Sequence, residues 1–384
     1  MNYFFTEGQL EIKRLARRIA EEKVLPVRAK LDETGEFPHD LMKEFAAAGF
    51  NGVYIPEQYG GTGGGVLDMC LIVEEISRVC GGVGVCYAAN GLAAYPIILG
   101  ANEDQKKRYL PRIASGEWIG AFGITEPGAG SDASAIKTTA IRDGNNFVLN
   151  GAKHFITNGG VAHFYTVIAS TDPGRGGRGL SAFLVEKGTP GFTFGKKENK
   201  MGIRASMTCE LIFQDCRIPA ENLLGKENLG FVTAMRTFDR TRPGVGAQAV
   251  GIAQGALEAA TKYAQERVQF GAPLSALEGI QFMLSDMATK VEAARALVYA
   301  AARHADSGAK NMPGFSAMAK LFASDMAMAV TTDAVQIFGG YGYMKDYPVE
   351  KMMRDAKITQ IYEGTNQVQR LVIARELLRG AIFE

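Results

Sequence analysis

Apolar residues in the first third of the chain recur with helical spacing. Thr6 and Gln9 have the spacing of a capping box, in which two side chains satisfy backbone groups at a helix start. Helical periodicity follows in the apolar positions Leu10, Ile12, Leu15, Ile19 and Leu25. A second helix is predicted over residues 41–48, with Gly49 at its end, followed by a flexible loop over the glycine-rich run 59–65. Helical spacing resumes at 66–79, so the pattern predicts a helical region over residues 1–117.

A different pattern begins near Trp118, where short β-branched or aromatic runs alternate with turn residues. The runs are IGAFGIT, IKTTAIRD, NFVLNG, HFYTVIAS, LSAFLVEK, GFTFGK and CELIFQD. Asp143-Gly144 and the glycine-rich stretch 174–179 are among the turns that separate them. Regular short strands of this kind predict a β-barrel or sandwich. Because they do not alternate with helices, a dinucleotide-binding α/β unit is not expected.

After about Gly225 the pattern is helical to the end of the chain. The segments 244–265, 282–305 and 315–337 are long and rich in alanine, and small residues at helix contacts allow the close packing of a bundle. The sequence therefore predicts a multidomain α+β protein. Its expected parts are an N-terminal α-helical domain (1–117), a central β-barrel domain (118–225) and a C-terminal helical bundle domain (226–384).

Composition narrows the classes of function. The chain has 384 residues, 47% of them hydrophobic, and its net charge of +1 provides no basic field for nucleic acid. No apolar run is judged to reach the roughly 18 residues of a membrane-spanning helix, and the N-terminus lacks the order of regions of a signal peptide. Five cysteines without a CxxC pair favour reduced thiols, and with four histidines they suggest no metal-ligand cluster. We therefore expect a cytoplasmic protein without nucleic acid, metal or membrane insertion.

Three segments carry candidate chemistry, and each also has a plain structural interpretation. Residues 123–132 (GITEPGAGSD) follow an apolar strand and offer amides and hydroxyls to a polar ligand, although such a segment is usually only a turn. Residues 336–343 (QIFGGYGY) place glycines at a helix end, where they also serve as a C-cap. In 361–367 (IYEGTNQ), Glu363 stands in an apolar stretch and fits a desolvated base, whereas a Glu before Gly is more often a surface charge.

Together these segments resemble the acyl-CoA dehydrogenase family. GITEPGAGSDASA is similar to the family's first signature and QIFGGYGYMKDYPVEKMMRD to its second, while IYEGTNQVQR resembles the segment that carries the base in medium- and short-chain members. The likeness covers essentially the whole chain, including DRTRP at 239–243 and ERVQFG at 266–271. It implies a helical domain, a β-barrel and a C-terminal four-helix bundle. FAD is expected to lie extended between barrel and bundle, in a homotetramer that is a dimer of dimers.

The resemblance also implies a reaction. An acyl-CoA thioester is expected to be dehydrogenated to the trans-2-enoyl-CoA, with Glu363 taking the pro-R α-proton while flavin N5 takes the β-hydride. The Glu363 backbone N–H and a flavin ribityl hydroxyl are expected to polarise the thioester carbonyl. Some relatives carry the base on an earlier helix, at a position that matches Thr241 in this chain. A threonine cannot act as this base, so Glu363 is the candidate. Electrons are then expected to pass to an electron-transferring flavoprotein.

The resemblance also implies further site residues, because they match positions that bind FAD or substrate in the family. Cofactor contacts are implied for Phe122, Ile124, Thr125, Ser131, Phe155, Thr157, Arg267, Phe270, Gln336, Gly339, Gly340, Thr365 and Gln367. Substrate contacts are implied for Ser131, Asp239, Arg242, Tyr362 and Gly364. The cofactor residues between 267 and 340 match family positions that reach the FAD of a neighbouring subunit. For Asp239 and Arg242 the alternative role is to tie helices together.

Departures from the family pattern bear on the partner and the substrate. Glu278 stands where relatives usually have Gln on the adenine side. Thr62 and Gly64 stand where relatives often have leucines that anchor electron-transferring flavoprotein, so docking there is expected to be weaker or to use another surface. Segment 80–101, which matches the acyl pocket, has no Arg, Lys, Asp or Glu. This disfavours dicarboxyl thioesters and also the removal of a ring proton from a cyclic acyl-CoA, for which relatives use an acid in this segment. It favours an uncharged short- or medium-chain acyl group, with branched and alicyclic chains left open.

Two alternatives use the same scaffold. An acyl-CoA oxidase would pass electrons to oxygen, and a lyase that breaks a C–S bond would lack the base, so Glu363 counts against the lyase. A non-catalytic flavin-bearing subunit is a third interpretation, and it predicts that acyl-CoA does not bleach the flavin.

Overall fold

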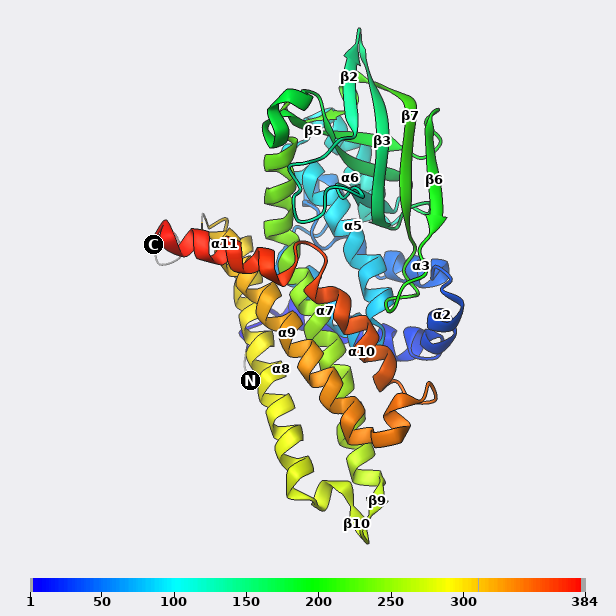
Figure 1. The fold of residues 1–384 in the computed structure, drawn as a ribbon, viewed down its shortest axis with the longest axis vertical. Coiled ribbons are helices and arrows are strands. Elements are labelled where there is room, and N and C mark those ends of the chain that lie inside the picture. The colour runs from blue at the N-terminus through cyan, green and yellow to red at the C-terminus, as the bar shows by residue number, and fades with distance from the viewer. Residues whose placement is uncertain (1–2, 310, 381–384) are drawn as a thin grey trace.

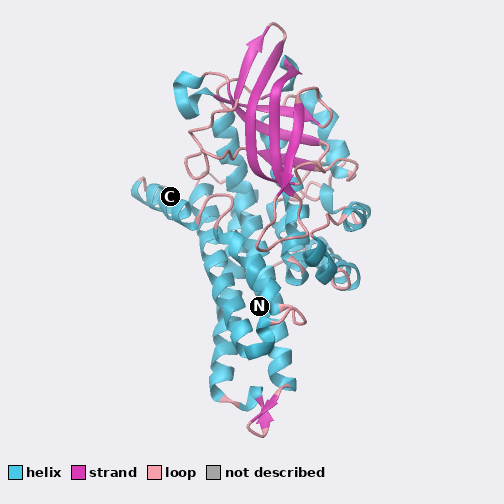
Figure 2. Ribbon diagram, turned by 45° about the vertical axis from the view of Figure 1, so that its right-hand side comes forward, coloured by secondary structure: helices cyan, strands magenta, loops and turns pink. Residues whose placement is uncertain are grey.

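The computed structural model describes residues 3–309 and 311–380, with helices toward both ends of the chain and a sheet between them (Figures 1 and 2). The N-terminal helices are α1 (Glu7–Ile19), α2 (Arg28–Thr34), α3 (His39–Ala47), α4 (Val66–Val79), α5 (Gly81–Gly100) and α6 (Glu103–Ala114). The predicted capping box at α1 is confirmed, because Thr6 Oγ1 accepts from the Gln9 amide and Gln9 Oε1 from the Thr6 amide. A short π-helical turn, Ala20–Val24, continues α1 and was not predicted.

Helix α5 corrects the judgement that no apolar run is long enough to span a membrane. Gly81–Gly100 has 20 residues and a mean hydropathy of 1.4, so it meets that test by length and composition. However, 78% of its most apolar window is buried inside the protein. Its apolar character is therefore explained by packing, since a helix that is hydrophobic all round belongs in a core.

The middle region is one eight-stranded sheet. Its strands are β1 (Gly120–Gly123), β2 (Thr139–Asp143), β3 (Asn146–Thr157), β4 (Phe164–Ser170), β5 (Leu180–Glu186), β6 (Phe192–Lys197), β7 (Thr208–Pro219) and β8 (Leu223–Leu224). The hydrogen-bonded order is β6-β7-β3-β2-β4-β5-β8, with β1 added parallel to β4. Aromatic and aliphatic side chains from β1 to β7 enclose a hydrophobic core of the sheet's own, separate from the large helical core.

The C-terminal helices are α7 (Gly230–Glu266), α8 (Glu278–Asp306), α9 (Met312–Phe338), α10 (Val349–Lys357) and α11 (Asn366–Leu378). A small hairpin of β9 (Val268–Gln269) and β10 (Ala272–Pro273) interrupts them, whereas the sequence predicted helix throughout. The predicted domain boundaries at 117/118 and 225/226 stay predictions. The changes of secondary structure fall between Ala114 and Gly120 and between Leu224 and Gly230.

Helix α7 connects the sheet to the bundle and lies against α4, α5, α8, α9 and β5 (Figure 1). Two glycines allow α4 to approach it closely. A Cβ at Gly251 would lie 2.2 Å from the Glu74 carbonyl oxygen, and one at Gly255 would lie 2.0 Å from the Arg78 carbonyl oxygen. This contact fixes α7 where the sheet and the helices meet, and the candidate site is built at that junction.

Candidate active site

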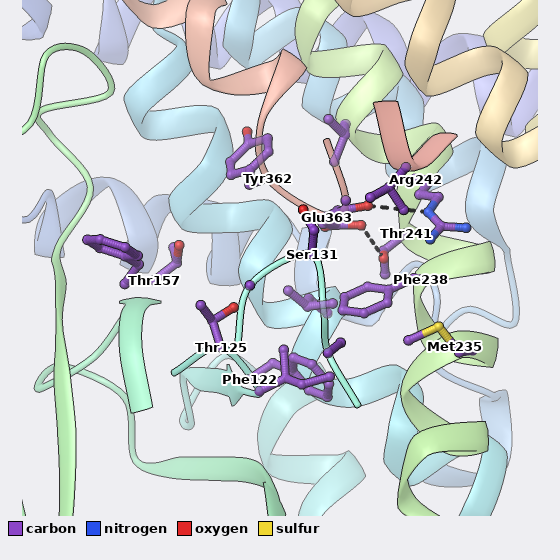
Figure 3. Close-up of a pocket in the computed structure, with 18 of the residues that line it drawn as sticks. Phe122, Thr125, Ser131, Thr157, Met235, Phe238, Thr241, Arg242, Tyr362 and Glu363 are labelled. Atoms are coloured by element: carbon purple, nitrogen blue, oxygen red, sulfur yellow. Dashed lines mark hydrogen bonds between the residues drawn. The ribbon is translucent and has the colours of Figure 1, made fainter. Parts of the chain in front are cut away.

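A cavity of about 400 Å³ lies where the N-terminal helices, the sheet and the C-terminal helices meet. Its walls come from α5, the segment after β1, the end of β3, the first half of α7 and the turn before α11. Figure 3 shows Glu363 near the centre, with Thr241 and Arg242 of α7 on one side. On the other side are Thr125, from the segment after β1, and Thr157, at the end of β3. The structure therefore brings together residues from three distant parts of the sequence.

Glu363 occupies a strained turn whose backbone is held in place. Its φ is +52° and that of Gly364 is +89°, so two consecutive residues are left-handed. Such a conformation is costly for a residue with a side chain and persists where the surroundings enforce it. The Thr241 hydroxyl donates to Glu363 Oε2 at 2.6 Å. The threonine that the sequence excluded as a base thus contacts the base candidate directly.

Burial changes the acidity of Glu363. Desolvation raises the pKa of its carboxyl to about 7, and the Thr241 hydrogen bond and the charges of Arg242 and Lys320 oppose that rise. A carboxylate with a pKa near neutrality has the proton affinity that a general base needs. The prediction of a desolvated carboxyl at this position is consistent with that environment, and the surface-charge interpretation is not.

The carbonyl groups of the same turn are held by side chains of the surrounding helices. Arg242 Nε and Gln369 Nε2 donate to the Glu363 carbonyl oxygen at 3.3 and 3.1 Å. Lys320 Nζ and Gln369 Nε2 donate to the Gly364 carbonyl oxygen at 2.8 and 2.9 Å. In the described part of the chain the Glu363 N–H has no acceptor. It is therefore available to a ligand oxygen.

The opposite wall presents hydroxyl groups. Thr125, Ser131 and Thr157 line the cavity, and no acceptor or donor for their side-chain hydroxyls exists among residues 3–309 and 311–380. Phe122, Ile124 and Phe155 add apolar surface to this wall, and Phe155 is 60% exposed with φ +59°. A flat polar ring with apolar edges fits such a wall.

The segment after β1 is anchored by a buried ion pair that the sequence did not reveal. Lys153 of β3 donates to Glu126 Oε1 at 2.7 Å, and both side chains are buried. Glu126 also accepts from the amides of Lys137 and Thr138 at 2.7 and 3.0 Å. These bonds fix the segment that carries Thr125 and Ser131.

The remaining substrate residues lie at or behind the cavity. Tyr362 and Gly364 line it, and the Tyr362 hydroxyl donates to Gln248. Asp239 lies behind the wall, where it accepts from Arg242 at 3.2 Å. Burial raises the pKa of Asp239 to about 6. Arg242 also joins α7 to the turn through its bond to the Glu363 carbonyl oxygen. The substrate contacts of both residues and the alternative structural role stay predictions.

Several predicted cofactor residues lie elsewhere. Arg267, Gly339 and Gly340 line a second concavity of about 540 Å³ between the β9–β10 hairpin and the end of α9, with Gln336 one residue before its lining. Phe270, at the hairpin turn, is 95% exposed. Thr365 accepts from the Val368 amide as the N-cap of α11, and Gln367 is exposed. Arg267, Phe270, Gln336, Gly339 and Gly340 lie outside the Glu363 cavity, whereas Thr365 and Gln367 follow Glu363 in the chain. The cofactor contacts of all these residues stay predictions.

Comparison with known proteins identifies the family. Models of the acyl-CoA dehydrogenase N-terminal, middle and C-terminal domains match residues 6–117, 121–216 and 228–378. The chain belongs to the acyl-CoA dehydrogenase family. A short-chain-specific acyl-CoA dehydrogenase of Clostridium acetobutylicum is 49% identical over 99% of this chain and 100% of its own length. The predicted family and fold class are thereby confirmed.

Solved structures of this family agree in fold. Butyryl-CoA dehydrogenase from Megasphaera elsdenii has 49% identity and a TM-score of 0.96, and the match covers 99% of this acyl-CoA dehydrogenase and 100% of that chain. A chain from a structure described as the electron transferring flavoprotein of Acidaminococcus fermentans has 54% identity and a TM-score of 0.97, over 99% and 100% of the two chains. The protein is therefore an FAD-dependent oxidoreductase of the acyl-CoA dehydrogenase type.

The cavity wall fits FAD on this structure's own features. Gly128 and Gly130 do not have positive φ, and a Cβ at either position would meet nothing within 4 Å. Neither backbone conformation nor packing within the chain therefore requires glycine at these two positions. Of the two, Gly130 lines the cavity, where a glycine allows a ligand to lie close to the backbone. The same ligand would supply hydrogen-bond partners for the free hydroxyls of Thr125, Ser131 and Thr157.

Proposed function

We propose that this acyl-CoA dehydrogenase oxidises the Cα–Cβ bond of an uncharged short- or medium-chain acyl-CoA to the trans-2-enoyl-CoA, with Glu363 as the base. The observation that carries the proposal is the Glu363 carboxyl, which lines the cavity, accepts from Thr241 at 2.6 Å and has a pKa raised by burial to about 7. FAD, when bound, would accept the hydride that leaves the β-carbon.

Glu363 contributes twice to the proposed reaction. Its carboxylate takes the α-proton, and its free N–H donates to the thioester carbonyl oxygen, where negative charge develops. Losing one preorganised donor of this kind typically costs about 10²–10³-fold in kcat. Arg242 and Gln369 bind the Glu363 carbonyl oxygen and so fix the left-handed turn that carries the N–H.

The acyl end of the cavity is apolar. Met69, Val85, Ala88, Leu92 and Val245 line it, and none of them carries a charge. An ionised tail would lose its hydration there without gaining a partner, which is costly. The wall therefore supports a substrate with an uncharged acyl group, as the segment 80–101 predicted.

The nucleotide end of the substrate is assigned to a basic rim. Arg175 and Arg178 are exposed on the β4–β5 connection (Pro173–Gly179) and line a concavity of about 440 Å³. Phe231 of α7 lines both this concavity and the main cavity. In the described part of the chain neither arginine has an ion-pair partner. Phosphate groups of CoA are suitable ligands for such guanidinium groups.

The proposal extends to partners and location. Electrons pass to an electron-transferring flavoprotein, and the similarity to the Acidaminococcus fermentans structure supports this choice. A homotetramer built as a dimer of dimers would place Arg267, Gly339 and Gly340 of one copy against the FAD of another. The proposed location is the cytoplasm.

Replacing Glu363 tests the function. A Glu363→Gln variant keeps the size and polarity of the side chain and removes the base. It should retain FAD and lose about 10²–10⁴-fold of kcat in butyryl-CoA oxidation. Glu11→Gln, an exposed substitution on α1, is the control and should leave the rate unchanged. Near-normal turnover by Glu363→Gln would exclude this base, and peroxide formation in air without another acceptor would favour the oxidase.

A further inference from the structure

Three lysines are buried among the described residues, and one of them lacks a carboxylate partner. Lys153 pairs with Glu126 and Lys351 pairs with Asp355. Lys320 of α9 is fully buried as well, but none of the ion pairs of residues 3–309 and 311–380 includes it. An unpaired buried cation is expensive, so such a group is kept where its charge or its hydrogen bonds have a use.

The hydrogen bonds of Lys320 lead directly to the reactive turn. Its Nζ donates to the Gly364 carbonyl oxygen and to Asn366 Oδ1, both at 2.8 Å. Asn366 is itself fixed, because its Nδ2 donates to Asp325 Oδ1 at 2.6 Å and to Ser324 Oγ at 2.9 Å. Lys320 thus spans the residues on either side of Thr365 and joins the left-handed turn at 363–364 to the start of α11.

We propose that Lys320 is a positioning residue for Glu363: its ammonium group holds the left-handed turn from behind and places a positive charge near the base. This inference rests on the proposed function, since it assumes that Glu363 takes the proton. The hydrogen bond fixes the Gly364 carbonyl, and with it the backbone that directly follows Glu363. The positive charge favours the ionised carboxylate.

The charges around Lys320 agree with this role. The charged groups that face it or its partners are Glu363 on the turn, Arg242 and Asp239 on α7, Asp325 on α9 and Arg370 on α11. Burial lowers the pKa of Lys320 to about 7, and the Glu363 carboxylate opposes that shift. Each of the two groups therefore favours the charged form of the other.

The expected direction of a change follows from the proton balance. Glu363 accepts a proton only when ionised, so the rate rises as the pH passes through its pKa. A nearby cation lowers that pKa. Without the cation the pKa of Glu363 rises, and the acid limb of the rate profile moves to higher pH.

A Lys320→Met variant of the flavin-loaded protein tests the inference. The rate of anaerobic flavin bleaching by butyryl-CoA should fall by about 10²-fold, because small misplacements of a catalytic group have effects of that size. The KM should change little, and the acid limb should move to higher pH. Ser324→Ala on the same helix loses a contact to Asn366 but keeps the Lys320–Gly364 bond, so it should leave the profile in place.

A second variant keeps the test valid if Lys320→Met folds poorly. Lys320→Gln keeps a donor near Gly364 without the charge, so it should show the same displaced limb with a smaller loss of rate. Flavin content and the melting temperature report folding independently. If both Lys320 variants keep the original acid limb while Glu363→Gln is inactive, the proposed positioning role of Lys320 is wrong. The assignment of Glu363 as the base is then unaffected. If Glu363→Gln turns over normally, the proposed function itself fails.

Discussion

Thr241 donates its hydroxyl proton to Glu363 Oε2 across 2.6 Å, which joins α7 to the turn before α11. The bond favours the ionised form of the carboxyl, whereas burial favours the neutral form. The pKa of about 7 is the outcome of these opposing effects. A residue that cannot act as the base therefore helps to set the pH at which the base works.

A Thr241→Val substitution should move the acid limb of the rate profile to higher pH. A hydrogen bond to a charged group contributes about 1.5–3 kcal/mol, which corresponds to a rise in the pKa of Glu363 by about one unit or more. The measurement is kcat/KM for butyryl-CoA against pH. The control is Thr237→Val, one turn earlier, whose hydroxyl bonds to the Thr233 carbonyl. An unmoved limb in Thr241→Val would mean that the hydrogen bond does not control the base.

A Lys153→Met substitution should destabilise the protein and weaken FAD retention. It leaves the Glu126 carboxylate buried without its partner at 2.7 Å, and breaking such a pair typically costs about 3–5 kcal/mol. The free energy of unfolding in denaturant measures the loss. Lys196→Met, at an exposed position, is the control. The double variant Glu126→Gln/Lys153→Met should recover part of the loss, because no charge is then left unpaired.

The sequence predicted the order of the regions because periodicity reports which face of an element is buried. Short β-branched or aromatic runs separated by turn residues marked the strands, and alanine-rich segments marked the bundle. The β9–β10 hairpin was missed, since two-residue strands at 268–269 and 272–273 are too short to show a period. Helix α5 was misjudged because its glycines and Asn90 interrupt the apolar run, although the mean hydropathy remains high.

Only those residues of the site that lie within short sequence motifs could be predicted from the sequence. Glu363 stood in a recognisable segment, and the structure gives it a desolvated environment. Lys320 and the Glu126–Lys153 pair gave no local signal, because each depends on residues 27 or more positions apart that meet only in the fold. A lysine within an alanine-rich helical segment reads as an exposed charge until its burial is known.

An Ala88→Leu substitution should shorten the acyl chain that the enzyme accepts. Ala88 of α5 lines the cavity, and its small side chain leaves room that three added carbon atoms would fill. Each acyl CH₂ that no longer fits should lose about 0.8 kcal/mol of binding. Relative kcat/KM values over a series from butyryl- to octanoyl-CoA measure the change. Ala29→Leu, exposed on α2, is the control. A uniform loss at every chain length would show that Ala88 does not bound the acyl tail.

Replacing Arg175 and Arg178 with glutamine should weaken binding of CoA esters and leave the chemistry intact. Both arginines line the concavity that shares Phe231 with the main cavity. Hydrogen bonds between charged groups of this kind contribute about 1.5–3 kcal/mol each. The KM for butyryl-CoA should therefore rise at least tenfold while kcat stays near its original value. Butyryl-pantetheine, which lacks the nucleotide, provides the decisive comparison: its KM should be the same for the variant and the unchanged protein. Arg217→Gln, which removes a pairing with Asp143 on the sheet, is the matched control. Equal losses for both thioesters would mean that these arginines act through the structure of the loop, because a nucleotide contact cannot affect a substrate without a nucleotide.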